Sequence, residues 1–369
     1  MRGTASAVAA LAITASLAVA PAARAASPAC DARPIQTALK ALASVGTGVA
    51  VTVRSPLCGV WKGGVGLADR RTGRKVTGDE HSRIGSDTKT WTATVVLQLA
   101  GEGRINLDDT VERYLPGLIR TKRYDGRKIT IRQLLQHTSG LPDYLDAPFW
   151  ADEEAHRWDH IEPLQTVRQA LALPAPERAP SGFAYANTNY NLAGLIVAKV
   201  TGRGIGAEID QRIIKRLGLR ETSWPGDRTT IPKPDLRSYV KRDGALVDRT
   251  EWNTSEADAS GELISTGADA TAFWTVLMTG KLLAPAQLAE MKQTIVDDYG
   301  QDYGLGIEGY RIAPDLLAWG HSGGMASGHT FRNAVTDDGQ RAVTLLIGTD
   351  TFDSDAVQTV INNLIRDLR

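Results

Sequence analysis

Hydrophobic residues near both ends of the chain fall in the short Val-rich or alternating runs that are typical of β-strands. The predicted strands are residues 48–54, 60–68, 303–309, 329–335 and 342–348. Thr336-Asp337-Asp338-Gly339 separates the last two runs and favours a hairpin. Apolar residues at helical spacing also predict a helix at each end, over 35–44 and 357–365, the latter capped by Asp353 or Ser354.

The middle of the chain has a different pattern, with helical segments separated by loops that contain proline. Residues 88–100 are apolar and lack Gly and Pro, and Gly101-Glu102-Gly103 ends the run. Further helices are predicted over 131–137, 164–173, 190–201, 206–217, 267–277 and 285–295. Strands at both ends predict an α/β fold, with one antiparallel sheet built from both termini. We expect residues 26–85 and 260–369 to form the α/β domain, and 86–259 to form an inserted, mainly helical domain.

The first 25 residues have the features of a secretory signal peptide. A positive start, Met1-Arg2, precedes an apolar run over 5–20 that is too short to span a membrane stably. Ala23-Arg24-Ala25 has the small-x-small form of a cleavage site, so we expect a secreted protein that begins after Ala25. Ser27 lies three residues before Cys30, where a lipoprotein signal carries an apolar residue, and we therefore expect no stable membrane anchor.

The composition is that of an ordinary globular protein, and it narrows the class of partner. The 369 residues include 42 basic and 42 acidic side chains, so the formal net charge is zero. A nucleic-acid-binding protein needs a basic face to replace counterions, and we expect no nucleic-acid partner. Cys30 and Cys58 are the only cysteines of the sequence. In an oxidising compartment they are expected to form a disulfide.

Candidate chemistry first occurs where the N-terminal strands give way to the apolar helix. Ser86 and Lys89 are three residues apart, so they share one face if the helix begins at Ser86. The N-terminal end of a helix presents free N–H groups and a positive dipole, which favour an anionic oxygen there. Lys89 is then placed to accept or hold the serine proton. A capping serine followed by an exposed lysine would have the same spacing.

Two further segments carry polar groups that suit acyl transfer. In Tyr185-Ala186-Asn187, the phenol can act as a general base if neighbouring cations lower its pKa, and the amide can orient a lysine. In Gly320-His321-Ser322-Gly323-Gly324, the glycines allow a substrate to lie against backbone N–H groups that stabilise an oxyanion. Taken alone, the first segment also fits a capped helix start and the second a glycine-rich turn.

The order Ser-x-x-Lys, Tyr-x-Asn, His-x-Gly resembles that of the penicillin-recognising serine hydrolases, above all the D-alanyl-D-alanine carboxypeptidases and class C β-lactamase-like enzymes. The resemblance covers nearly the whole mature chain. Further segments that carry it are Tyr114-Leu115-Pro116-Gly117, Leu134-Leu135-Gln136-His137-Thr138-Ser139-Gly140-Leu141, Leu217-Gly218-Leu219, Glu221-Thr222-Ser223 and Tyr303-Gly304-Leu305-Gly306. It implies the β-lactamase or penicillin-binding transpeptidase-like fold, an antiparallel sheet flanked by helices plus an all-α domain.

The resemblance also implies catalytic roles for four side chains. Ser86 is the acylated nucleophile, and Lys89 and Tyr185 are the pair that handles its proton. Asn187 contacts the substrate and the lysine. The reaction implied is acyl transfer in two steps, which needs no metal and no organic cofactor.

The backbone N–H groups of Ser86 and Gly324 are implied as the oxyanion hole, beside His321, Ser322 and Gly323. His321 stands where β-lactamases usually carry Lys, and this resembles the carboxypeptidase-type variant. The implied ligands are peptides that contain D-amino acids, with β-lactams as their mimics. The resemblance also implies a monomer.

One position departs from the carboxypeptidase pattern. In that group an Arg follows the Tyr-Gly-Leu-Gly-Leu strand and holds the terminal carboxylate of the substrate. Here Glu308 follows this run, and it would repel a carboxylate. Arg311 or Arg332 would have to substitute. The departure favours an esterase or an aminopeptidase, because a Glu can hold a substrate amine.

We therefore expect a secreted serine hydrolase, first of all a D-alanyl-D-alanine carboxypeptidase that acts on cell-wall-type peptides. An esterase or D-aminopeptidase of the same family is the alternative within the class. A penicillin-binding sensor module without turnover is the alternative outside it.

Three other patterns are given structural interpretations. Ser322 lies in a Gly-x-Ser-x-Gly sequence, but the nucleophile elbow with that sequence needs a helix directly after the serine, and a strand is predicted here. His156 and His160 are at metal-ligand spacing, yet we expect a solvated helix face and no metal site. His81 and His137 are expected to be structural.

Overall fold

A nine-stranded antiparallel sheet lies at the centre of the computed structural model, which describes residues 30–177 and 181–368. The expected cleavage site after Ala25 lies outside the described residues. The strand order is β2-β1-β15-β14-β12-β11-β10-β9, and β13 pairs with β14. The strands are β1 (Val49–Ser55), β2 (Gly59–Val65), β9 (Ile295–Val296), β10 (Asp302–Tyr303), β11 (Glu308–Ala313), β12 (Leu316–Gly320), β13 (Gly323–Gly324), β14 (Thr330–Thr336) and β15 (Ala342–Ile347).

Strands from the two ends of the chain lie side by side in this sheet. β1 pairs with β15 in an antiparallel register that runs from Val49 opposite Ile347 to Arg54 opposite Ala342. β14 and β15 form the predicted hairpin. The antiparallel sheet built from both termini is thereby confirmed.

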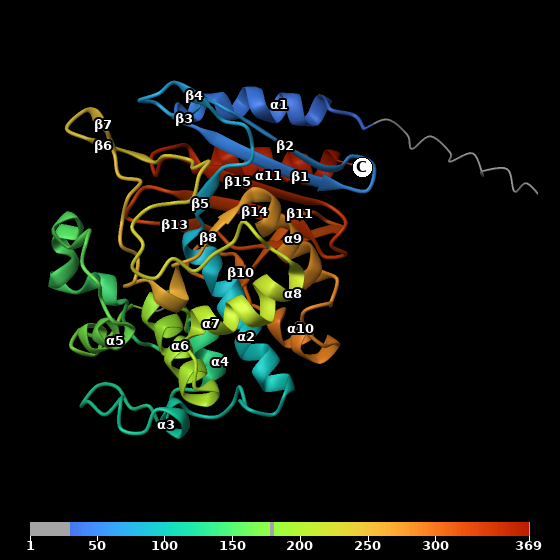
Figure 1. Cartoon of the computed structure of the whole chain (residues 1–369). Coiled ribbons are helices and arrows are strands. Elements are labelled where there is room, and N and C mark those ends of the chain that lie inside the picture. Colours follow the sequence, from blue (N-terminus) through green and yellow to red (C-terminus); the bar gives the residue numbers. More distant parts are fainter. Residues whose placement is uncertain (1–29, 178–180, 369) are drawn as a thin grey trace, which may run out of the picture.

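Helices cover both faces of the sheet. Figure 1 shows α1 along one side and α2, α6 and α7 on the other. The helices are α1 (Arg33–Leu42), α2 (Thr88–Gly101), α3 (Val111–Tyr114), α4 (Ile131–Leu135), α5 (Pro163–Leu171), α6 (Asn187–Thr201), α7 (Ile205–Ile209), α8 (Lys215–Leu217), α9 (Gly267–Met278), α10 (Pro285–Met291) and α11 (Ser354–Asp367). Short 3-10 turns lie at Ala43–Val45, Gly85–Asp87, Tyr144–Asp146, Pro148–His156 and Asp258–Ser260, and one π turn lies at Asp210–Ile214.

The sheet separates two hydrophobic cores. On one face, α1 and α11 bury their apolar stripes, including Ile35 and Ile361, against strand residues such as Val343. Asp353, one of the two predicted caps, begins α11 by accepting a hydrogen bond from the Ala356 N–H at 2.9 Å. The other face carries the larger core, into which α2 and α9 pack. This second core supports the start of α2, which directly follows the turn that contains Ser86.

Residues 60–68 are not one strand, because the chain turns at Gly66, with a φ of +78°, between β2 and the separate strand Leu67–Asp69. The helix predicted over 285–295 ends at Met291.

Two further segments differ in the structure. Residues 303–309 are not one strand: β10 ends at Tyr303, β11 begins at Glu308, and Gly306 between them has a φ of +76°. That left-handed conformation suits glycine and turns the chain back on itself. The second difference is a two-stranded hairpin, β6 (Tyr239–Arg242) and β7 (Ala245–Asp248), within the segment predicted as mainly helical.

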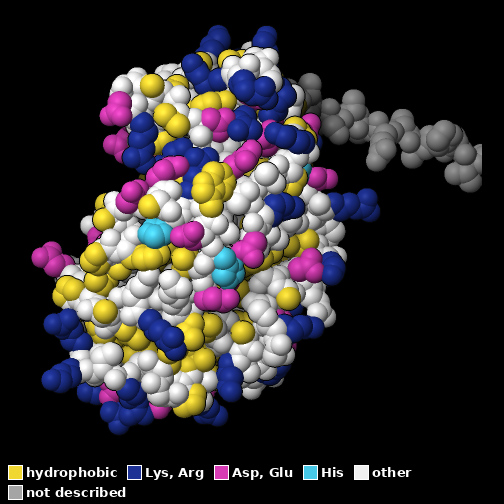
Figure 2. Space-filling view, turned by 60° about the vertical axis from the view of Figure 1, so that its left-hand side comes forward, with side chains coloured by type: hydrophobic (Ala, Val, Ile, Leu, Met, Phe, Trp, Pro, Cys, Tyr) yellow, Lys and Arg dark blue, Asp and Glu magenta, His cyan; other side chains and the backbone are white. Residues whose placement is uncertain are grey.

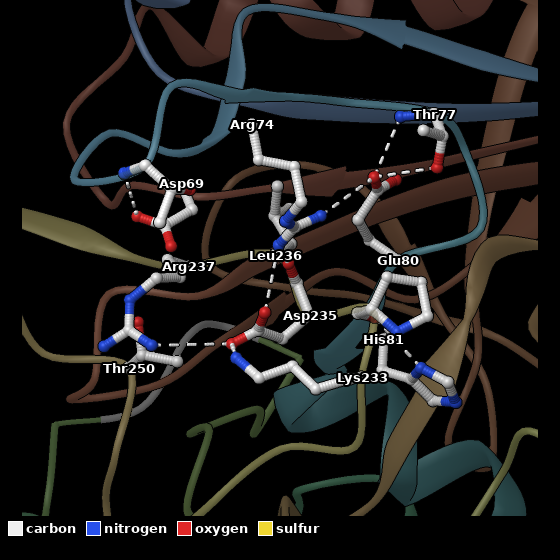
Figure 3. A network of polar contacts seen from close by, with 12 residues as sticks. Asp69, Arg74, Thr77, Glu80, His81, Lys233, Asp235, Leu236, Arg237 and Thr250 are labelled. Atoms are coloured by element: carbon white, nitrogen blue, oxygen red, sulfur yellow. Dashed lines mark hydrogen bonds and ion pairs between the residues drawn. The ribbon is translucent and has the colours of Figure 1, made fainter.

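A buried polar network fixes the chain just before the candidate nucleophile (Figure 3). Glu80 is fully buried, and its carboxylate accepts hydrogen bonds from Thr77 and from the Gly78 N–H at 2.8 Å. Arg74 bridges from Glu80 to Asp235, which lies beside His81 in an isolated β-bridge. Buried charges are tolerated when they are paired and hydrogen-bonded. The network therefore holds β5 (His81–Arg83), which pairs with β8 (Ile264–Thr266) and leads into the nucleophile turn.

Over residues 30–177 and 181–368 no helix has both the length and the apolar character needed to cross a membrane. The predicted disulfide between Cys30 and Cys58 is confirmed. It ties the start of the described chain to the turn between β1 and β2, with 28 residues of sequence separation.

Replacing both Cys30 and Cys58 with Ser is expected to lower the free energy of unfolding by about 3–4 kcal/mol, because the loop they close is no longer constrained in the unfolded chain. Urea unfolding of the oxidised protein and the double variant measures the difference. Reduced wild-type protein is the control and should match the variant. Equal stability of all three would contradict the prediction.

Candidate active site

Ser86 lies in the 3-10 turn between β5 and α2, and the next residue anchors that turn. The Asp87 carboxylate is buried and accepts hydrogen bonds from two indole N–H groups, Trp91 at 3.1 Å and Trp274 at 2.9 Å. Burial raises the pKa of Asp87 to about 7, and the two indoles oppose that shift. Trp91 belongs to α2 and Trp274 to α9, so the two helices together fix the position of the nucleophile turn.

Glycines allow this turn to lie directly against β13. Gly85 has a φ of +52°, and a Cβ atom there would come within 2.7 Å of the Gly324 carbonyl oxygen. A Cβ at Gly323 would lie 2.0 Å from the Ile84 carbonyl oxygen. The backbone of Ser86 and that of β13 are therefore neighbours, as an oxyanion hole shared between them requires.

Lys89, in the first turn of α2, is fully buried and touches three acceptors. Its Nζ lies 2.9 Å from Ser86 Oγ, 2.7 Å from Asn187 Oδ1 and 2.8 Å from the Ser260 carbonyl oxygen. Burial lowers the pKa of Lys89 to about 7, although nearby carboxylates favour the charged form. At neutral pH a large fraction of this amine is therefore uncharged and able to accept the hydroxyl proton of Ser86.

Asp143 is a site residue that the sequence reasoning missed. Its Oδ2 accepts hydrogen bonds from the Asn187 backbone N–H at 3.0 Å and from Asn187 Nδ2 at 2.7 Å. The amide of Asn187 is thereby turned so that its oxygen faces Lys89. Burial raises the pKa of Asp143, while the Asn187 and Leu145 N–H groups and Lys89 oppose the shift. The only signal in the sequence is its position two residues after the Leu134–Leu141 run.

Tyr185 faces the same serine from the other side. Lys89 Nζ lies 4.9 Å from the centroid of its ring, and the Ser86 side chain is near enough to its hydroxyl to favour the phenolate form. Burial raises the pKa of Tyr185 well above its ordinary value, and the neighbouring Ser86 side chain only partly offsets this. The residue as a whole is 37% exposed, so one part of the side chain is open to solvent. The lowered pKa that a phenolate base would need is not found.

His321 is buried at the end of β12, and both of its ring nitrogens are occupied. Nε2 lies 3.0 Å from the Tyr303 hydroxyl and Nδ1 lies 2.6 Å from the Ser322 carbonyl oxygen. Because Nδ1 faces a carbonyl, it carries the proton, and Nε2 accepts from Tyr303. Burial lowers the pKa of His321, and Glu308 opposes the shift. His321 is therefore a neutral ring that joins Tyr303 to β13.

Glu308 begins β11 next to these residues. Its Oε1 accepts a hydrogen bond from Ser322 Oγ at 3.1 Å and lies 3.7 Å from His321 Nδ1, and its Oε2 accepts from Tyr310. Arg332 lies 5.7 Å from the Phe352 ring and donates to the Phe331 carbonyl oxygen. Phe352 packs in the core under α1 and α11, on the sheet face away from Lys89. Neither cation named in the sequence analysis contacts Glu308.

The structure thus brings Ser86, Lys89 and Asn187 into one hydrogen-bonded group, with Tyr185 and β13 beside it. The strand β13, rather than a helix, follows Ser322, which excludes the nucleophile-elbow interpretation.

His156 and His160 lie near the surface and bind carboxylates of their own. His156 Nδ1 lies 2.9 Å from Asp159, and His160 lies between Asp227 and Glu162. Figure 2 shows histidine side chains next to acidic ones, among interspersed basic and acidic groups. Over the described residues no group of three or more His, Cys, Asp or Glu side chains is arranged to hold a metal ion.

A family model of the beta-lactamases matches residues 35–362, and the chain belongs to the beta-lactamase family. It is a serine hydrolase of that type. The crystal structure of a D-stereospecific amidohydrolase from Streptomyces sp. is similar, with 38% identity, a TM-score of 0.82, and coverage of 90% of this chain and 98% of that one. The D-amino acid amidase of Ochrobactrum anthropi SV3, solved with L-phenylalanine amide, has 27% identity, a TM-score of 0.77, and coverage of 90% and 97%.

Among curated proteins, Protein flp of Staphylococcus aureus (strain MRSA252) is 27% identical over 183 residues, which are 50% of this chain and 36% of that protein. The match therefore spans about a third of the length of this relative.

Replacing Gly85 with Ala is expected to abolish most activity, because the new Cβ must push the nucleophile turn away from Gly324. We expect kcat/KM for hydrolysis of S-phenyl thioacetate (acetyl thiophenyl ester) to fall at least about 100-fold, since displacing a catalytic group by about 1 Å has that effect. Gly73→Ala is the matched control: its φ is +73°, but nothing lies within 4 Å of the new Cβ. The control should cost about 1–2 kcal/mol of stability and keep activity. Equal activity of the two variants would contradict the prediction.

Proposed function

We propose that the protein hydrolyses amide bonds of small D-amino-acid compounds that carry a free amine, through an acyl-enzyme on Ser86. The observation that carries the chemistry is the 2.9 Å contact between Ser86 Oγ and a buried amine whose pKa is about 7. A serine next to a neutral amine has both the nucleophile and the base that acyl transfer needs.

In the first step, neutral Lys89 takes the proton of Ser86 as Oγ bonds to the substrate carbonyl carbon. The oxyanion lies between the backbone N–H groups of Ser86 and Gly324. Tyr185, whose raised pKa keeps it protonated, gives its proton to the leaving nitrogen as the C–N bond breaks. Lys89 then returns the serine proton to the phenolate, so that both groups regain their starting states.

In the second step, water attacks the acyl-enzyme and loses a proton to Lys89. The C–O bond to Ser86 breaks, and the serine oxygen takes that proton back. The products are the free acid and the restored enzyme. The reaction uses this chain's own residues for every proton transfer.

The charge at Glu308 supports a substrate with an amine. Its carboxylate favours the charged form of Lys89, so its field extends to the reacting groups. A terminal carboxylate would be repelled there, whereas an ammonium group would be attracted. The similarity to a D-stereospecific amidohydrolase and a D-amino acid amidase supports the same substrate class.

A D-alanyl-D-alanine carboxypeptidase is the second candidate. The His321-Ser322-Gly323 sequence resembles the carboxypeptidase type, and β-lactams would then act as mimics that acylate Ser86. Against it stands Glu308, with no cation in contact with it among the described residues. A sensor module that is acylated and never released would use the same residues without turnover.

We also propose that the protein acts outside the cytoplasm as a monomer and without a cofactor. The Cys30–Cys58 disulfide supports an oxidising compartment.

The rate is expected to depend on pH through Lys89. With S-phenyl thioacetate, a substrate that has no amine to titrate, kcat should rise with pH through about 7 and level off above it, because the amine of Lys89 must be neutral to accept the serine proton.

Asp143→Asn removes a charge that favours protonated Lys89, so the midpoint of this pH profile should move to lower pH. The new amide keeps an acceptor for Asn187. Asp146→Asn, at an exposed acid nearby, is the control and should leave the midpoint unchanged. A midpoint that moves upward in Asp143→Asn would contradict this reasoning.

The substrate class is tested by measuring ammonia release from D-alanine amide and L-alanine amide, and D-alanine release from N-acetyl-D-alanyl-D-alanine. We expect hydrolysis of the D-amide alone, lost in Ser86→Ala. Glu308→Gln should raise KM for D-alanine amide about 10-fold, as expected for the loss of about 1.4 kcal/mol of charge attraction, and leave KM for its N-acetylated form unchanged.

Release of D-alanine from the dipeptide, without amide hydrolysis, would establish the carboxypeptidase instead. Labelling of Ser86 without turnover of any compound would establish the sensor module.

A further inference from the structure

His137 contacts the chain on both sides of Tyr185. Its carbonyl oxygen accepts the Ala184 N–H at 2.8 Å, and its Nδ1 accepts the Ala186 N–H at 3.1 Å. Between these two bonds its imidazole stacks on the Tyr185 ring, with centroids 4.2 Å apart and an interplanar angle of 27°. One residue therefore fixes the backbone before and after Tyr185, and one face of its ring as well.

These contacts fix the protonation state of His137. A backbone N–H can only donate, so Nδ1 must be the acceptor and the ring proton is on Nε2. Asn189 Nδ2 lies 3.1 Å from the same Nδ1 and reinforces this assignment. The ring is fully buried, and burial, aided by the charge of Lys89, lowers its pKa well below the ordinary value. His137 is therefore a neutral acceptor, and it does not exchange protons with the site.

Two features of His137 are unfavourable for the stability of the fold. It is one of the few described non-glycine residues with positive φ, at 57°, and its buried Nε2 has no hydrogen-bond partner among the described residues. A left-handed conformation is unfavourable at a residue other than glycine, because its Cβ lies too close to the following carbonyl oxygen. A buried donor without an acceptor is also unfavourable, because nothing replaces the water it has lost. A histidine that served packing alone would need neither feature, and strain of this kind concentrates at functional sites.

We propose that His137 is a positioning residue, which holds the Tyr185 hydroxyl on the line between Ser86 and the leaving group. This inference rests on the proposed function, because Tyr185 is assigned there as the proton donor to the leaving nitrogen. His137 touches neither Ser86 nor Lys89 through a hydrogen bond in the described structure, so it acts through Tyr185. The expectation that His137 is merely structural is replaced by this proposal.

Two variants separate the two kinds of contact. His137→Phe keeps a ring for stacking on Tyr185 and removes the acceptor for the Ala186 N–H. His137→Asn keeps an acceptor near the position of Nδ1 and removes the ring. His81→Phe is the matched control, because His81 is also buried but contacts Pro234 and Glu221 instead.

The readout is the ratio of kcat for D-alanine anilide to kcat for D-alanine thiophenyl ester. Aniline must gain a proton to leave, whereas thiophenolate leaves without one, so only the anilide depends on the donor Tyr185. A smaller folded fraction cancels in this ratio because both substrates are measured on the same protein. Both His137 variants are expected to lower the ratio at least about 10-fold, which is less than the roughly 100-fold or more that a proton donor contributes, because Tyr185 is displaced and not removed. His81→Phe should leave it unchanged.

Tyr185→Phe should lower the ratio by at least as much as either His137 variant. Adding His137→Phe to Tyr185→Phe should then change the ratio by less than about 2-fold, because the donor to be positioned is already absent. An unchanged ratio in both His137 variants, or a full further loss in the double variant, would overturn the proposal.

The same experiment distinguishes failure of the proposed substrate class. Wild-type protein that cleaves acetyl thiophenyl ester but no D-alanine compound would contradict that class. The role of His137 would then be measured with acetyl 4-nitroanilide against the acetyl thioester, with the same expected ratios and the same contradicting outcome.

Discussion

The site depends on the removal of one amino group from water. Lys89 makes three hydrogen bonds, to a serine hydroxyl, an amide oxygen and a backbone carbonyl oxygen, and no carboxylate lies among these partners. A lysine paired directly with a carboxylate would stay charged, and one in water would have its ordinary pKa. Burial among neutral acceptors lowers the pKa to about 7 and leaves the amine available as a base.

The fold supplies each acceptor from a different part of the chain. Ser86 comes from the turn between β5 and α2, Asn187 from the start of α6, and Ser260 from the 3-10 turn before β8. Two glycines, Gly85 and Gly323, let the nucleophile turn approach β13 more closely than any side chain would allow. The sheet then fixes β13 through its pairing with β14, so the rigid part of the molecule sets the position of the backbone beside the serine.

The two carboxylates near the site are separated from Lys89 by intervening residues. Asp143 acts through the amide of Asn187, and Glu308 acts across Ser322 and His321. Both carboxylates favour the charged amine, and burial still outweighs them. The site can therefore carry negative charge that attracts an ammonium group without losing its neutral base. His137 is neutral for the same reason, since it too lies in a buried position near Lys89.

The sequence by itself determined the strands at both ends, the long helices α2, α6, α9 and α11, the disulfide and the motif residues, because these are encoded in local periodicity or in rare residue types at fixed spacing. Tertiary structure decided the rest. The pKa values of Lys89 and Tyr185 depend on burial by segments that are distant in sequence, and no local pattern reports that burial. Asp143 and His137 act through contacts with residues 44 and 49 positions away, so the motif near them marks their place in the chain but not what they contact. The conformation of residues 303–309 is also visible only in the tertiary structure. The chain turns at Gly306, where a Cβ atom would lie 2.6 Å from the Tyr190 hydroxyl and 2.8 Å from Ala93, whereas alternation alone predicts a strand.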